Sequence, residues 1–243
     1  MPPVVKPPTR PDTPDEEILA AEEAQVLSLL DDEQRIDAIS RELRTGFAAL
    51  SSLGPAVTIF GSARTPPDHP QYAESRELAR RLGAAGFPII TGGGPGAMEA
   101  ANRGALDAGV RSVGLDIELP HEQSMNRYVD LPLTFHYFFT RKVMFVRFAC
   151  AFVCLPGGFG TFDELFEVLT LRQTGKIRAR PVVLFGSDYW KGLVDWLGGP
   201  VLAEGKIDSA DVAELVVTDD LDEVVERITR ASPGPSPRRP ARG

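Results

Sequence analysis

Three loops rich in glycine and small residues are the parts of this sequence best suited to chemistry. They read GSAR at residues 61–64, TGGGPGAME at residues 91–99 and LPGGFGTFDE at residues 155–164. Each follows an apolar run and precedes a segment that can begin a helix. Glycine lets a backbone approach a ligand closely, and a helix N-terminus adds unpaired N–H groups and partial positive charge. Tight turns can use glycine for geometry alone, but three such loops together favour a phosphate or nucleotide site.

Candidate phosphate- and substrate-binding residues follow from these loops. They are Gly61, Ser62, Gly93, Gly94, Gly96 and Met98 in the first two loops, and Gly157, Gly158, Phe159, Gly160 and Thr161 in the third. Ser62 lacks the G-x-S-x-G surroundings of a nucleophilic serine, so we expect its hydroxyl to bond a phosphate.

The spacing within the loops excludes two common nucleotide-binding motifs. The chain contains no G-x-x-x-x-G-K-[ST], the phosphate loop of many ATPases. Residues 92–96 contain a G-x-G pair, but Ala97 stands where a dinucleotide fold would place its third glycine. The loop also follows the second apolar run rather than the first. An ordinary dinucleotide-binding dehydrogenase is therefore not expected.

Four charged residues are further candidate contacts to the same ligand. Arg141 and Lys142 are adjacent cations in an otherwise apolar segment, HYFFTRKVMFVRF. Glu164 and Glu167 share one face of a helix that we expect to open at Thr161, which places Glu164 in the first turn. There the helix dipole favours the ionised carboxylate. Glu164 either stabilises its helix and pairs with Arg141 or, beside a bound phosphate, acts with that cation to cleave the ligand.

Histidine and cysteine spacing predicts neither a metal site nor a disulfide scaffold. The residues concerned are His69, His121, His136, Cys150 and Cys154. Metal sites need ligands at short, regular spacings, and disulfide-stapled domains need more cysteines. We therefore expect buried free thiols in a reducing cytoplasm, no metal and no cofactor. Glu122, in LPHEQ, is either a solvated loop carboxylate or an acceptor for a ligand.

The segment from residue 55 to residue 230 alternates short apolar runs with helical patterns. The runs are residues 56–60, 87–91, 111–115, 151–155, 180–185 and 213–217, and the helical segments are roughly 69–85, 96–109, 138–149, 161–174, 188–203 and 219–230. Apolar runs without polar alternation predict strands buried on both faces. Their alternation with helices predicts a single Rossmann-like α/β domain, a doubly wound parallel sheet. Ligands of that architecture bind at the carboxyl ends of the strands, where the three loops lie.

The regions outside 55–230 differ in composition. Residues 1–14 contain six prolines and residues 232–243 read SPGPSPRRPARG, so we expect two disordered tails, the second one basic. Residues 15–51 have apolar residues at helical spacing and predict a helical extension. The formal net charge of -8 argues against a non-specific nucleic-acid binder. Because no apolar run is long enough to span a membrane, we expect a cytoplasmic protein without membrane or nucleic-acid partners.

Three of these sequence elements resemble those of the LONELY GUY family. They are PGGFGTFDE at residues 156–164, GGGPGAME at residues 92–99 and the pair Arg141 and Lys142, in a resemblance over roughly residues 55–230. Members of that family are cytokinin riboside 5'-monophosphate phosphoribohydrolases, with relatives acting on AMP and other nucleoside monophosphates. Many such sequences have been labelled lysine decarboxylases, but Lys142 adjoins an arginine and has no cofactor-binding pattern around it.

The resemblance implies a Rossmann-like fold, at least a homodimer, and hydrolysis of the N-glycosidic bond to free base and ribose 5-phosphate. By motif position it implies Arg141 and Glu164 as the catalytic pair and residues 158–161 as the turn that holds the 5'-phosphate. It also implies that Thr170 lies in the binding region. We expect Glu122 to be an acidic substrate contact, because its loop departs from the short plant-like pattern.

Two other classes of function remain open from the sequence. A non-catalytic nucleotide carrier or sensor, such as the molybdenum-cofactor carriers that this fold resembles, would use the same loops without needing Glu164 and Arg141 together. A DNA-handling protein of related Rossmann type is disfavoured by the acidic charge balance. Because both charged residues are present, a phosphoribohydrolase is the favoured hypothesis. The motifs leave the preferred base, the size of the oligomer and the role of residues 15–51 open.

Overall fold

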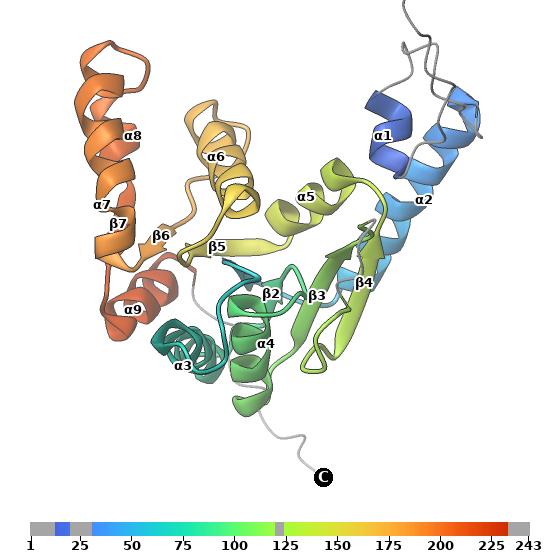
Figure 1. Cartoon of the computed structure of the whole chain (residues 1–243), viewed down its shortest axis with the longest axis horizontal. Helices are drawn as coiled ribbons and strands as arrows, with labels where there is room; N and C mark the ends of the chain where they lie inside the picture. The colour runs from blue at the N-terminus through green and yellow to red at the C-terminus, as the bar shows by residue number, and fades with distance from the viewer. Residues whose placement is uncertain (1–12, 20–30, 120–123, 233–243) are drawn as a thin grey trace, which may run out of the picture.

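Seven parallel strands form the central sheet of the computed structural model, which describes residues 13–19, 31–119 and 124–232 (Figure 1). The strands are β1 (Ala56–Phe60), β2 (Ile89–Thr91), β3 (Ser112–Ile117), β4 (Leu131–Phe135), β5 (Ala149–Cys154), β6 (Val182–Phe185) and β7 (Leu215–Thr218). Their order across the sheet is β4-β3-β2-β1-β5-β6-β7. The sheet therefore begins at a central strand, winds to one edge, returns beside β1 and winds to the other edge. This order confirms the predicted doubly wound parallel sheet.

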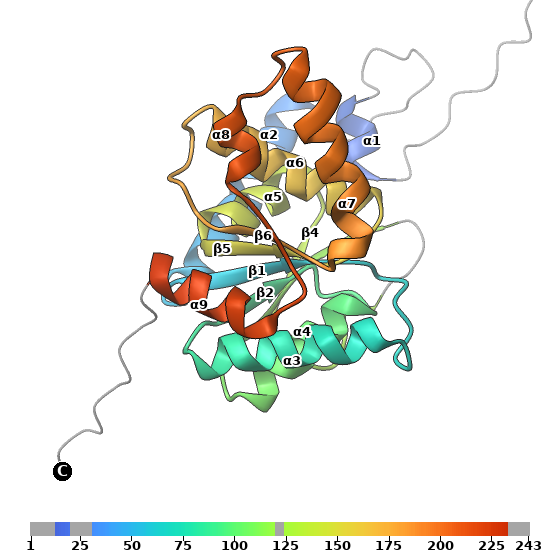
Figure 2. The same ribbon diagram turned by 90° about the vertical axis from the view of Figure 1, so that its left-hand side faces the viewer.

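Helices cover both faces of the sheet. They are α1 (Pro14–Leu19), α2 (Asp32–Leu50), α3 (Pro70–Ala84), α4 (Ala97–Asp107), α5 (Phe138–Arg147), α6 (Phe159–Gln173), α7 (Ser187–Trp196), α8 (Ser209–Ala213) and α9 (Leu221–Ala231), with a π-helical turn, η1 (Leu197–Val201), directly after α7. Figure 2 shows α3, α4 and α9 on one face and α2, α5, α6 and α7 on the other. Each face of the sheet has its own hydrophobic core. Leu78 and Ile228 belong to the core under α3, α4 and α9, and Phe145 and Trp190 belong to the core on the opposite face. Every residue of β1 and β6 is buried between these layers, which explains why all of them except Thr58 are apolar.

The sequence locates six of the seven strands and does not predict β4. This strand lies at the edge of the sheet and contains Pro132, a residue that lacks an N–H and is typical of edge strands. Burial alternates along β4 instead of being continuous. The short helix α8 is also not predicted. The helix expected over 188–203 is helical throughout, but it is π-helical rather than α-helical over Leu197–Val201, where Pro200 lies.

The first two helices support the N-terminal end of α5. Glu42 of α2 accepts hydrogen bonds from the backbone N–H of His136 at 2.9 Å and from the hydroxyl of Thr140 at 2.7 Å. Asp15 of α1 accepts a hydrogen bond of 3.1 Å from the backbone N–H of Phe138, the first residue of α5. Part of the segment 15–51 is thus attached to a helix that lines the site described below.

Several expectations concern residues beyond the described ranges. The predicted tails, 1–14 and 232–243, lie almost wholly outside them, as do residues 20–30 of the predicted helical extension. Within the ranges that are described, no helix combines the length and the apolar character needed to cross a membrane.

Candidate active site

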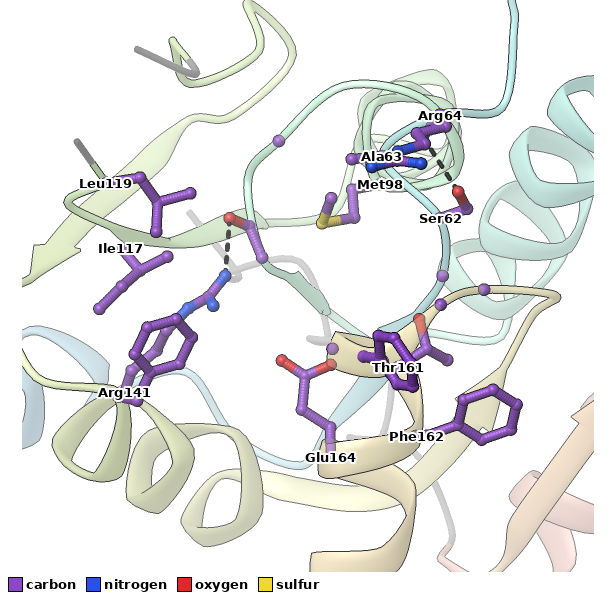
Figure 3. A pocket seen from close by; sticks show the side chains of 18 of the residues that line it. Ser62, Ala63, Arg64, Met98, Ile117, Leu119, Arg141, Thr161, Phe162 and Glu164 are labelled. Atoms are coloured by element: carbon purple, nitrogen blue, oxygen red, sulfur yellow. Dashed lines mark hydrogen bonds between the residues drawn. The ribbon is translucent and has the colours of Figure 1, made fainter. Parts of the chain in front are cut away.

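A pocket of about 690 Å³ opens at the carboxyl ends of β1, β2, β3 and β5 (Figure 3). β1 and β5 are neighbours whose connections leave in opposite directions, and doubly wound sheets bind ligands at such a switch point. The predicted site residues that line the pocket are Gly61, Ser62, Gly94, Met98, Arg141, Gly157, Gly158, Phe159, Gly160, Thr161 and Glu164. The structure therefore brings together residues from all three glycine-rich loops and the two proposed catalytic side chains.

The turn between β5 and α6 forms the polar end of the pocket. α6 begins at Phe159, with Gly158 as its N-cap and no side chain capping its first N–H groups. Glycine is required at position 157, because a Cβ there would lie 2.1 Å from Oγ1 of Thr161. The hydroxyl of Tyr189, on α7, donates a hydrogen bond to the carbonyl of Gly157, and Tyr189 also lines the pocket. The helix N-terminus thus presents N–H groups and partial positive charge to the pocket.

The loops after β1 and β2 are joined beside this turn. The N–H of Ala97 donates to the carbonyl of Ser62 at 2.9 Å. Gly96 has a φ of +68°, and a Cβ at this position would meet the same carbonyl at 2.5 Å. Gly93 and Gly96 are not among the lining residues of the pocket and shape the loop instead. The Ser62 hydroxyl accepts a hydrogen bond from the N–H of Arg64, whose exposed side chain lies at the pocket.

Arg141, on α5, is held in one orientation by backbone carbonyls. Its Nε donates to the carbonyl of Leu115 at 2.6 Å, and its Nη2 donates to the carbonyl of Gly92 at 3.2 Å. The guanidinium carbon lies 5.0 Å from the centre of the Phe145 ring. The residue is only 8% exposed. Burial lowers the pKa of Arg141, whereas the negative charge of Glu164 raises it. These carbonyl contacts, rather than an ion pair with Glu164, fix the guanidinium among the described residues.

Glu164, on α6, lies across the pocket from Arg141, with its carboxylate turned towards the guanidinium (Figure 3). Because α6 begins at Phe159, two residues earlier than expected, Glu164 lies beyond the first helical turn. The dipole effect falls off there, and burial raises the pKa of Glu164 from 4.5 to about 7, with Arg141 opposing the shift. The prediction that the helix dipole keeps Glu164 ionised is therefore wrong. Near neutral pH its carboxyl exists in both protonation states.

The far end of the pocket, beside β3, is lined mainly by apolar side chains. Ile117 and Leu119 line it from the end of β3, and Phe138 lines it from the start of α5. The half-buried carboxylate of Asp116 also lines the pocket at β3. Sequence reasoning missed Asp116 and Arg64. Asp116 was detectable, because it is a carboxylate near the end of an apolar run, at the sheet edge where ligands bind.

Three predicted contacts lie beside the pocket rather than in it. Nζ of Lys142 lies 3.2 Å from a carboxylate oxygen of Asp163 and 3.4 Å from one of Glu167. With Thr170, these residues line a separate groove along α5 and α6. Successive helical residues differ by about 100° in direction, so Lys142 points away from the pocket that its neighbour Arg141 enters.

Two further expectations concern Glu122 and metal binding. Glu122 lies outside the described residues. Where the chain is described, no cluster of three or more His, Cys, Asp or Glu residues could hold a metal ion. Cys150 and Cys154 are free thiols, the second of them buried.

Comparison with known proteins relates this site to a family. A family model described as a possible lysine decarboxylase matches residues 98–228, yet no lysine is found among the described residues that line the pocket. The chain is 32% identical over 163 residues to the cytokinin riboside 5'-monophosphate phosphoribohydrolase of Mycobacterium marinum, covering 65% of this chain and 87% of that protein.

Solved structures agree with the fold. A structural-genomics target solved by X-ray crystallography matches with a TM-score of 0.56 at 25% identity, over 72% of this chain and 99% of the other. The molybdenum cofactor carrier protein of Chlamydomonas reinhardtii matches with a TM-score of 0.53 at 21% identity, over 73% and 98%, and shares the fold alone. From the family match over more than half of its length and the likeness to named relatives, the chain belongs to the LONELY GUY family of phosphoribohydrolases.

Proposed function

We propose that this chain is a nucleoside 5'-monophosphate phosphoribohydrolase. It hydrolyses the N-glycosidic bond of cytokinin riboside 5'-monophosphates, AMP or both, and releases the free base and ribose 5-phosphate. The observation that most strongly supports this is a single pocket in which Arg141 and Glu164 lie between a helix N-terminus and an apolar end. These three parts suit the three parts of the substrate, which are its phosphate, its ribose and its base.

In this proposal the 5'-phosphate binds at the N-terminus of α6. The N–H groups of residues 158–161, the Ser62 hydroxyl and the Arg64 guanidinium supply donors around that position. Partial positive charge at the helix terminus and a full charge on arginine both favour a phosphate dianion. The base then points towards Ile117 and Leu119, where apolar side chains contact its faces.

Glu164 is placed beside the ribose, where charge develops during cleavage. Breaking the N-glycosidic bond builds positive charge on the ribose ring, as in glycoside hydrolysis. The ionised carboxylate stabilises that charge and accepts a proton from the water whose oxygen bonds to C1'. The bonding electrons leave with the base nitrogen, which takes up the proton and regenerates the carboxylate. A pKa of about 7 suits this exchange, because a general base works best near the ambient pH.

Arg141 supplies a fixed positive charge opposite Glu164. Its two hydrogen bonds to backbone carbonyls fix the position of the guanidinium in the pocket. Its charge lowers the pKa of Glu164 and so keeps part of that carboxyl ionised at neutral pH. Its Nη1, which makes no hydrogen bond among the described residues, is left to contact the ribose or the departing base.

The same proposal includes a cytoplasmic homodimer. Apolar side chains are exposed on α5 and α6, namely Phe138, Phe139, Val143, Phe159 and Phe166. A second copy would remove this surface from water and would cover the groove of Lys142, Glu167 and Thr170, which supports a role for these residues near the completed site. The free cysteines are typical of a reducing compartment. A mass of one chain by light scattering would contradict the dimer.

Product analysis tests the activity. Purified protein is incubated with AMP or isopentenyladenosine 5'-monophosphate, and the products are separated by chromatography. We expect equal amounts of free base and ribose 5-phosphate. Tight nucleotide binding without either product would instead indicate a carrier, the other function that the same loops allow.

A further inference from the structure

The pocket contains a charged side chain that the proposed reaction does not use. Asp116 lies near the end of β3 and lines the pocket beside Ile117. It is half-buried, and burial raises its pKa, while the N–H of Ile117 and the charge of Arg141 oppose that shift. Within the described part of the chain, its carboxylate forms no ion pair and no hydrogen bond with another side chain. A partly desolvated carboxylate costs free energy unless donors reach it, so this position suits a ligand that brings a donor.

The position of β3 in the sheet indicates which part of the substrate Asp116 meets. β5, whose following turn forms the phosphate end, is separated from β3 by β1 and β2. Adjacent strands lie about 4.8 Å apart, so the carboxyl ends of β5 and β3 are roughly 14 Å apart. That span is comparable to the length of a nucleoside 5'-monophosphate from its phosphate to the far edge of its base. Asp116 therefore lies at the level of the base edge, beyond the ribose that Glu164 and Arg141 flank.

We propose that Asp116 is a specificity-determining residue that accepts a hydrogen bond from the exocyclic amino group of the base. The inference rests on the proposed function and adds the substrate class to it. An ionised carboxylate only accepts hydrogen bonds, so it favours bases with an amino group at that edge, such as adenine, singly N6-substituted adenine and cytosine. Hypoxanthine and uracil present a carbonyl oxygen there, which repels the carboxylate and leaves it without a donor.

The wild-type enzyme alone provides the first test. N6-methyl-AMP keeps one N–H on the exocyclic nitrogen, whereas N6,N6-dimethyl-AMP has none, and IMP has an oxygen in its place. Hydrogen bonds to charged groups are among the stronger ones in proteins, so their loss is expected to lower kcat/KM by about 10- to 100-fold. We therefore expect dimethyl-AMP and IMP to be hydrolysed 10- to 100-fold less efficiently than N6-methyl-AMP and AMP respectively.

A matched pair of variants provides the second test. Asp116→Asn keeps the shape of the side chain but adds a donor, so the ratio of kcat/KM for AMP to that for IMP is expected to fall at least tenfold. Glu118→Gln removes a carboxylate two residues away, where an exposed side chain lies 3.0 Å from His136 instead of lining the pocket. The AMP to IMP ratio of this control is expected to stay at the wild-type value.

The outcomes separate the inference from the function on which it rests. Hydrolysis of AMP and IMP by the wild type with kcat/KM values within twofold would overturn the role of Asp116 and leave the phosphoribohydrolase in place. An unchanged ratio in a folded Asp116→Asn variant would do the same. If that variant fails to fold, the wild-type series decides. A wild type that hydrolyses none of these monophosphates would overturn the proposed function and this inference with it.

Discussion

The substitution Glu164→Gln measures how much the burial of this carboxylate destabilises the folded protein, independently of the role of Glu164 in the reaction. Burial raises the pKa of Glu164 from 4.5 to about 7, and each pKa unit corresponds to about 1.4 kcal/mol between the two protonation states. The ionised carboxylate therefore costs the folded state at most about 3.5 kcal/mol. Because the side chain lines a pocket that is open to water, we expect about 2 kcal/mol. Glutamine has a similar shape and no charge, so it avoids this cost.

The sign and the pH window follow from the raised pKa. Below pH 4.5 the carboxyl is protonated in both the folded and the unfolded chain, so the variant and the wild type are equally stable. As the pH rises from 4.5 to about 7, the unfolded chain gives up its proton first and the wild type loses stability relative to the variant. Above that range the difference is complete. For a chain of this size, about 2 kcal/mol corresponds to a melting temperature roughly 4–8 °C higher for the variant.

Melting curves followed by circular dichroism at about pH 4.5 and about pH 8.5 measure this difference. Asp163→Asn is the matched control, since the neighbouring carboxylate is exposed and paired with Lys142. It is expected to show no gain at the higher pH. A Glu164→Gln variant that is no more stable than the wild type at the higher pH, or equally more stable at both, would refute the claim that the folded protein desolvates this carboxylate.

Two further predictions concern the arginines of the pocket. Arg141→Met removes the positive charge that lowers the pKa of Glu164. The acid limb of the pH profile of kcat should therefore move to higher pH. If this limb does not move, a group other than Glu164 titrates there. Arg64→Ala should raise the KM for AMP about tenfold through loss of a charged phosphate contact, with little change in kcat. Steady-state kinetics with AMP and adenosine check the second prediction, and an equal loss with both substrates would contradict a phosphate contact.

Most of the fold was predictable because most strands are buried on both faces. In β1 and β6 every residue is covered by helices, so the sequence there is apolar except for Thr58, and the shortness of these runs favours strands over helices. β4 shows the limit of this rule. It pairs with a neighbour on one side only, alternates in burial and contains Pro132, so its sequence resembles a loop.

The site was predictable where backbone geometry dictates the residue type. Gly157 is required by a close contact within its own turn and Gly96 by a close contact with the loop after β1, and such requirements are visible in the sequence as glycines. Side-chain direction and desolvation depend on the packed structure instead. Lys142 therefore lies outside the pocket despite its neighbour Arg141, and the protonation of Glu164 follows from burial rather than from its place in a helix.

Parallel assays of the wild type and Glu164→Gln with AMP, isopentenyladenosine 5'-monophosphate and adenosine are the most direct test of the proposed reaction. The wild type is expected to release equal amounts of free base and ribose 5-phosphate from at least one monophosphate. The variant should be slower by about 10² to 10⁴. Adenosine should be a poor substrate, because it lacks the phosphate whose binding positions the ribose. Equal rates for wild type and variant, or no release by either from any monophosphate, would contradict the assignment.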